Sequence, residues 1–144
     1  MFASKIIGKN DVEFVNRNGE DPKIIQTQNQ IDEIVRIINE ECKSFEHIAI
    51  ICKCNREAQQ VYNALSKKIN ASLMKDAEDY NNRVLVATCA SAKGIEFDAV
   101  IIPNASDENY NNSVDKNILY VSSTRALHKL FFLTDGLVSK LLQV

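Results

Sequence analysis

The sequence lacks a glycine-rich phosphate loop, because none of its four glycines begins the pattern G-x-x-x-x-G-K-[ST]. It also has no apolar strand that ends in paired acidic residues, which hold the magnesium ion in phosphate-loop enzymes. No run of about 18 apolar residues occurs, and the N-terminus has no basic, apolar and small-residue secretion signal. These absences exclude a complete phosphate-loop ATPase, and they predict a cytoplasmic protein without a membrane partner.

Metal ligands and positive charge are also scarce. None of the cysteines Cys42, Cys52, Cys54 and Cys89 forms a C-x-x-C pair, so we expect reduced packing thiols and no metal site. The formal net charge is −2, and 25% of the residues are charged. No overall positive field therefore favours nucleic acid, and any such contact must be local.

The residues that are present predict one domain. The chain has 144 residues, of which 45% are hydrophobic, enough for one core. Residues 1–22 are polar and interrupted by glycine, asparagine and proline, so they are interpreted as an entry segment. Residues 23–144 form the predicted domain, and the abrupt start indicates a fragment of a longer protein.

Strands and helices are expected to alternate along this domain. Short apolar runs predict buried strands, and three- and four-residue spacing predicts helices. Such an alternation indicates an α/β domain with three layers, in which helices cover both faces of a mainly parallel sheet. The expected strands are residues 23–27, 47–52, 71–74, 83–89, 99–105 and 129–134, and the expected helices are 31–42, 55–69 with Asn55 as N-cap, 118–127 and 137–143.

Candidate site residues follow the expected strands, where parallel sheets bind their ligands. One group comprises Lys53, Asn55 and Arg56, and another lies near residues 122–125 on the expected helix. Between them, residues 88–98 join small hydroxyl residues, a lysine, a glycine and two carboxylates in one connection. From the residues alone, this connection is equally consistent with a phosphate- or ribose-binding loop and with a charged surface turn. A flavodoxin-like or receiver domain is disfavoured, because no acidic cluster ends the early strand.

Three segments resemble the helicase motifs of the UvrD-like superfamily 1 DNA helicases. Residues 88–97 resemble motif V, T-x-H-x-A-K-G-L-E-F, and residues 119–126 resemble motif VI, Y-V-x-x-T-R-A. Residues 48–55 resemble motif IV, in the same order along the chain. The resemblance implies a RecA-like, phosphate-loop-NTPase-type fold and the C-terminal motor domain of an ATP-dependent DNA helicase.

The resemblance also implies roles for single residues. Arg125 would be the catalytic arginine finger that stabilises charge on the γ-phosphoryl group. Gly94 and Glu96 would bind ATP, the carboxylate at its ribose, and Lys53 and Arg56 would add phosphate contacts. The predicted contacts to single-stranded DNA are Thr88, Ser91 and Lys93.

Two departures from the motifs point to a divergent subgroup. Lys53 replaces the usual motif IV arginine, and Ala90 replaces the motif V histidine. The lysine resembles the helicase-IV-like branch, some of whose members act on RNA polymerase. The alternative implied function is therefore a helicase-like module that binds RNA polymerase, with unwinding lost or secondary.

The implied cofactors are ATP and Mg²⁺, with Mg²⁺ held by an N-terminal RecA-like domain that this sequence lacks. The implied partners are that domain and single-stranded DNA or a duplex–single-strand junction, in a 3′-to-5′ motor for DNA repair. The fragment alone is expected to be inactive, because the Walker A and B motifs are missing.

Overall fold

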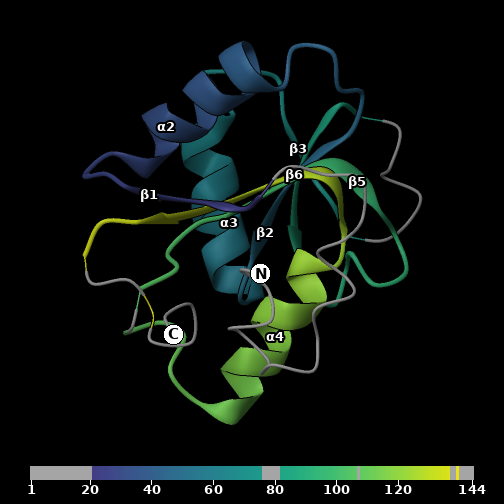
Figure 1. Ribbon diagram of the computed structural model, residues 1–144. Coiled ribbons are helices and arrows are strands. Elements are labelled where there is room, and N and C mark those ends of the chain that lie inside the picture. Colours follow the sequence, from purple (N-terminus) through teal and green to yellow (C-terminus); the bar gives the residue numbers. More distant parts are fainter. Residues whose placement is uncertain (1–20, 76–81, 107, 137–138, 140–144) are drawn as a thin grey trace.

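A six-stranded parallel sheet forms the centre of the computed structural model, which describes residues 21–75, 82–106, 108–136 and 139 (Figure 1). The strand order is β1-β6-β5-β2-β4-β3, and every neighbouring pair is parallel. The predicted α/β class with a mainly parallel sheet is confirmed. The strands are β1 (Lys23–Gln26), β2 (Ile48–Cys52), β3 (Ser72–Leu73), β4 (Val84–Thr88), β5 (Phe97–Ile102) and β6 (Ala126–Thr134), and the helices are α2 (Gln30–Arg36), the π-helical η2 (Ile37–Glu41), α3 (Asn55–Leu65) and α4 (Ser113–Ser123).

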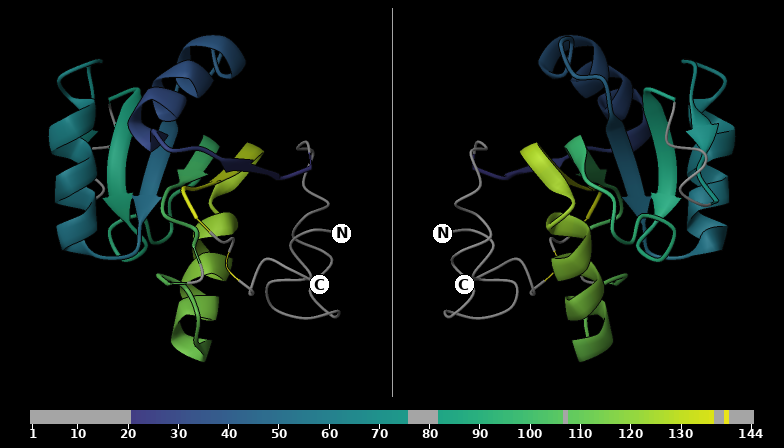
Figure 2. Two further views of the ribbon diagram at one scale, coloured as in Figure 1. Left: turned by 90° about the vertical axis from the view of Figure 1, so that its left-hand side faces the viewer. Right: turned by 90° about the vertical axis from the view of Figure 1, so that its right-hand side faces the viewer.

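The central strands are apolar along their whole length because both faces of the sheet are covered. All five residues of β2 and all five of β4 are buried. Their side chains alternate between two cores: Ile48 and Ile50 pack with α2, η2 and α3, whereas Ala49 and Ile51 pack on the side of α4. The predicted three layers are thus confirmed, and Figure 2 shows α3 and α4 on either side of the sheet.

The prediction for the helix before β6 was wrong at both ends. The expected helix at residues 118–127 begins at Ser113 and ends at Ser123, and Ala126 already belongs to β6. Asn112 caps the helix by accepting a hydrogen bond from Asp115 N at 2.9 Å, which satisfies one of the free N–H groups of the first turn. Residues 113–117, which precede the expected helix, are therefore helical, and Thr124 and Arg125 lie in the turn after the helix.

Smaller corrections concern the other boundaries. Asn55 is the first helical residue of α3 and not its N-cap, which is Cys54. The strand expected at 99–105 begins earlier, at Phe97, and His128 lies within β6 rather than before it. The entry segment lies outside the described residues except for positions 21 and 22, and so does the expected final helix except for Ser139.

No helix among the described residues is long and apolar enough to cross a membrane.

Candidate functional site

Two edges of the sheet carry the predicted site residues. The carboxyl edge is the one where β2 and β4 end, with Cys52 paired in register to Thr88. The amino edge is the one where strands begin, with Phe97 of β5 paired to Ala126 of β6. Four steps of about 3.3 Å separate the ends of a five-residue strand, so the two edges lie about 13 Å apart.

At the carboxyl edge, Thr88 and Ser91 form a tight hydrogen-bonded turn. Ser91 Oγ accepts from Thr88 N at 2.9 Å, and Ser91 N donates to Thr88 Oγ1 at 3.1 Å. The short polar side chains replace backbone hydrogen bonds where β4 stops, as such residues commonly do in turns. The turn fixes the start of the 88–96 connection in one conformation.

A hollow of about 370 Å³ lies beside this turn. Polar groups of three elements surround an apolar floor, a combination that accepts planar or sugar-like ligands. Sequence reasoning did not assign Gln59 or Lys75 to any site, because their approach to Thr88 depends on how α3 packs beside β3 and β4. The lining residues are Asn55, Ala58, Gln59, Leu73, Met74, Lys75, Thr88 and Ser91.

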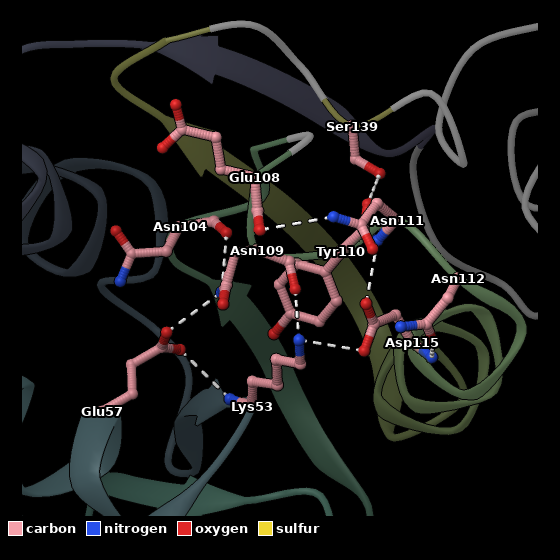
Figure 3. Close-up of polar contacts among 10 residues, drawn as sticks. All are labelled: Lys53, Glu57, Asn104, Glu108, Asn109, Tyr110, Asn111, Asn112, Asp115 and Ser139. Atoms are coloured by element: carbon pink, nitrogen blue, oxygen red, sulfur yellow. Dashed lines mark hydrogen bonds and ion pairs between the residues drawn. The ribbon is translucent and has the colours of Figure 1, made fainter.

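Lys53 also lies at the carboxyl edge, directly after β2, and its ammonium is turned toward α4. Lys53 Nζ is 2.9 Å from Asp115 Oδ1, donates to the carbonyl of Asn109, and lies 5.5 Å from the centroid of the Tyr110 ring. The Lys53 N–H donates to Glu57 Oε1 at 3.1 Å. Figure 3 shows the Lys53 ammonium between Asp115 and the Asn109 carbonyl, and the Lys53 backbone N–H bonded to Glu57.

The same contacts continue through the loop that follows β5. Asn109 Nδ2 donates to Glu57 Oε2 at 3.0 Å and to the Asn104 carbonyl at 3.1 Å (Figure 3). Asn104 has a left-handed backbone, with φ 53°, and its side-chain and backbone amide groups both bond to Gln30. Asparagine tolerates this conformation better than most residues. The side-chain amides of Gln30 and Asn109 thus fix the conformation of the loop after β5.

At the amino edge, the structure brings Gly94, Glu96 and Arg125 close together in the fold. Phe97 N donates to Arg125 O at 2.7 Å, which joins the end of the 88–96 connection to the turn after α4. Gly94 has φ +79°, and a Cβ added at this position would meet no atom within 4 Å. The left-handed backbone, and not lack of space, therefore favours glycine here. Gly94 and Glu96 are both exposed.

The Arg125 side chain is half-buried and is not sealed in the core. Its Nε and Nη2 donate to Thr124 Oγ1 at 3.3 and 3.0 Å. Thr124 Oγ1 in turn donates to the Val121 carbonyl at 2.7 Å, so the hydroxyl orients the guanidinium from the last turn of α4. A guanidinium has five N–H donors, and among the described residues only Thr124 accepts from Arg125, which leaves donors for an external oxyanion.

The structure therefore divides the predicted site residues into two sets. Thr88, Ser91, Lys53 and the exposed Arg56 lie at the carboxyl edge, and Gly94, Glu96 and Arg125 lie toward the amino edge. The exposed Lys93 lies on the connection between them. Lys53 and Arg56, although predicted to bind ATP, are not brought together with the other predicted ATP contacts.

The cysteines match the expected packing role only in part. Cys42 and Cys52 are buried, whereas Cys54 is exposed and Cys89 is half-buried. Burial raises the pKa of the Cys52 thiol well above its ordinary value, with smaller contributions from Glu57 and Cys54, so this thiol stays protonated. Within the described ranges, no three histidine, cysteine, aspartate or glutamate side chains are grouped as a metal site requires.

Part of the chain matches a known protein family. Residues 83–133, which contain β4, the 88–96 connection and α4 with its following turn, match the family of the UvrD-like helicase C-terminal domain. The chain is also 43% identical, over 61 residues, to the Gabija protein GajB of Bacillus cereus (strain VD045). The matched part is 42% of this chain and 12% of GajB, so the chain spans a small fraction of that relative.

Solved structures extend the similarity to the whole chain. The C-terminal domain of a possible DNA helicase from Lactobacillus plantarum has a TM-score of 0.80 and 29% identity, over 99% of this chain and 86% of that one. The helicase domain of Hef from Pyrococcus furiosus has a TM-score of 0.51 and 19% identity, over 75% of this chain and 26% of that one. The second similarity concerns the fold alone. The predicted likeness to a UvrD-like C-terminal domain with a RecA-like fold is confirmed.

Proposed function

We propose that this chain is the C-terminal motor domain of an ATP-dependent DNA helicase and supplies its arginine finger, Arg125. The observation that supports this most is the position of Arg125. Its guanidinium is oriented by Thr124, and Thr124 is the acceptor that the described part of the chain provides, so further donors can bind a ligand. The Arg125 backbone carbonyl is bonded to Phe97, where β5 begins next to Glu96. A planar, permanently charged group so placed can stabilise the charge that develops on a transferred phosphoryl group.

The amino edge would form half of a nucleotide site. The exposed Glu96 carboxylate suits hydrogen bonds from ribose hydroxyls, and the open space beside Gly94 lets a ligand approach the backbone. These groups fit a nucleotide but provide no magnesium ligand set, so Mg²⁺ and the phosphate loop would come from an N-terminal RecA-like domain. ATP bound there would supply the phosphoryl group that is hydrolysed. Lys53 and Arg56, at the other edge, are less suited to this site.

The carboxyl edge would contact single-stranded DNA. Thr88, Ser91 and the exposed Lys75 border the hollow. The exposed Arg56 and Lys93 are close in sequence to Asn55 and Ser91, which also line it, and add positive charge. Hydroxyl groups and cations of this kind bind the phosphate backbone without reading sequence. The 88–96 connection, which continues from this edge to Glu96, would join the two ligands within a few residues. Closure of the cleft between two such domains would then alternate the grip on the strand.

The test of the arginine finger is Arg125→Ala in the intact protein. DNA-stimulated ATP hydrolysis should fall on the order of a thousandfold, because the transition-state charge loses its partner. Binding of a non-hydrolysable ATP analogue should stay within about threefold, since most of the site belongs to the other domain. Arg125→Lys should recover little, because an ammonium lacks the bidentate fork.

Arg36→Gln is the matched control, because Arg36 lies on α2, pairs with Glu41 at 3.0 Å, and takes part in none of the contacts described for Gly94, Glu96 and Arg125. Its hydrolysis rate should equal that of the unchanged protein. Undiminished turnover in Arg125→Ala would refute the proposed role.

A helicase-like module that binds RNA polymerase is the second candidate. The net charge of −2 is compatible with protein docking. A module of this kind would not need to bind single-stranded DNA. The salt dependence of DNA affinity therefore distinguishes it from a DNA helicase.

A further inference from the structure

The ion pair between Lys53 and Asp115 connects the two edges through α4. Lys53 directly follows β2 at the carboxyl edge, two residues before Asn55 of the hollow. Asp115 lies in the first turn of α4, and the last turn of the same helix leads directly to Arg125. The eleven residues of α4 span about 16 Å, comparable with the distance between the edges. A helix of this length moves as one body.

The Asp115 carboxylate is the buried member of the pair. Its side chain is 5% exposed, against 28% for Lys53, so removing Lys53 would leave a carboxylate with little access to water. Asn111 N donates to Asp115 Oδ2 at 2.9 Å, which satisfies the second oxygen. A carboxylate at the N-terminus of a helix is also favoured by the helix dipole. The buried Asp115 carboxylate thus has partners for both of its oxygens, and these contacts fix the position of the ion pair.

The surrounding contacts tie the same lysine to the loop that precedes α4. Lys53 binds the Asn109 carbonyl, and Glu57 bridges the Lys53 N–H to the Asn109 side chain (Figure 3). Tyr110, between them, is 1% exposed and its carbonyl accepts from Ser139 Oγ at 2.6 Å. A displacement of the β2–α3 turn would thus be transmitted to α4 by direct bonds as well as by packing.

We infer that Lys53 and Asp115 are positioning residues that couple strand binding at the carboxyl edge to the placement of Arg125 at the amino edge. The inference rests on the proposed function. It gives Lys53 a role that its contacts support, because the ammonium binds Asp115 and Asn109 and lies at the edge opposite Glu96. Strand contacts at Asn55 and Thr88 would shift the end of β2, and α4 would carry the shift to the turn that holds Arg125.

The test uses Asp115→Asn in the intact protein, with ATP hydrolysis measured against single-strand concentration. Asparagine keeps the shape of the side chain and removes its charge. Hydrolysis without DNA should be unchanged within about twofold, whereas the stimulation at saturating strand should fall roughly tenfold, a usual size for coupling between sites. The half-saturating strand concentration should change less than about threefold, because Asp115 does not touch the strand.

The control is Glu108→Gln, which removes an exposed carboxylate from the same loop; its stimulation should equal that of the unchanged protein. Lys53→Met and the double variant complete a mutant cycle. Coupling through one pair predicts that the double variant loses no more stimulation than either single variant. Multiplying losses would show that Lys53 contacts a ligand by itself and would overturn the inference, as would full stimulation in Asp115→Asn.

Should Asp115→Asn fail to fold, Glu57→Gln takes its place, because Glu57 is half-buried and links Lys53 to Asn109. It should lower stimulation in the same direction, and unchanged stimulation would again overturn the coupling. Failure of the proposed function is distinct: either the unchanged protein shows no strand-stimulated hydrolysis, or Arg125→Ala retains it.

Discussion

At the scale of single residues, Asp115 is a buried carboxylate in the first turn of α4, and it forms an ion pair with Lys53. Burial alone would raise the pKa of its carboxyl group, but the Asn111 N–H and the Lys53 ammonium outweigh burial and hold that pKa below its ordinary value. A lowered pKa means that the ionised carboxylate stabilises the folded state. The contribution is present above the unfolded pKa of about 3.9 and is lost as the pH falls through the folded pKa.

This linkage predicts how Asp115→Asn changes acid stability. At pH 7 the variant should unfold with about 2 kcal/mol less free energy, the usual cost of losing hydrogen bonds to a charged group. The difference should begin to shrink as the pH falls below about 4, because the unfolded chain then binds a proton at Asp115 that the folded carboxylate binds only at lower pH. Urea unfolding at pH 7 and at about pH 3.5 measures both values, with Glu108→Gln as the exposed control. A difference that stays constant with pH would contradict the assigned charge of Asp115.

The proposed role of Arg125 stays a prediction from the sequence, where one motif supplies both the residue and its neighbours along the chain. The contacts of Lys53 could not be predicted from the sequence. They depend on residues 109–115, which are distant in sequence and reach Lys53 only after β5 pairs beside β2. The signal that was available locally was Asn112 followed three residues later by Asp115, which marks a helix start.

At the scale of elements, α4 depends on its cap. Replacing Asn112 with alanine should lower the free energy of unfolding by about 1 kcal/mol, because an N–H of the first turn loses its acceptor. Asn112→Asp should retain the stability, since a carboxylate caps equally well. Asn117→Ala, an exposed position within the same helix, should be neutral or slightly stabilising. Thermal unfolding of the three variants measures this, and an unchanged midpoint for Asn112→Ala would show that the cap is dispensable.

The buried strands were predictable where α4 was not, for a physical reason. β2, β4 and β5 are covered on both faces, so their sequences are nearly continuous apolar runs. Turns are rich in polar residues, so such runs are easily recognised as buried strands. The start of α4 consists of polar residues whose helical state is decided by side-chain caps. At its other end, Ser123 Oγ and Thr124 Oγ1 donate to the carbonyls of the last turn, which ends the helix although apolar residues follow.

At the scale of the whole molecule, net charge and local charge have different signs. The chain as a whole carries −2, but the exposed Lys75 lines the hollow and the exposed Lys93 lies on the 88–96 connection that starts beside it. Lys93→Ala in the intact protein should therefore weaken single-strand binding. It should also reduce the slope of log affinity against log salt by about 0.7, the value for one phosphate contact on a single strand.

Lys67→Ala, at an exposed position just beyond α3, is the matched control and should leave the slope unchanged. Fluorescence anisotropy at several salt concentrations gives both slopes. An equal slope in Lys93→Ala would exclude its phosphate contact. Strand affinity independent of salt in the unchanged protein would instead favour the protein-docking candidate.

The pairing of β1 with β6 has a consequence for synthesis. Lys23 pairs with Phe131 and Gln26 with Thr134, so the first strand of the described sheet waits for the last one. At roughly 5–20 residues per second, β1 emerges from the ribosome several seconds before its partner is made. Its only apolar residues are two isoleucines between Lys23 and Gln26, and these polar ends limit pairing of the unpartnered segment with other chains. A nascent chain stalled before β6 would expose β1 and one side of β5 to chaperones together.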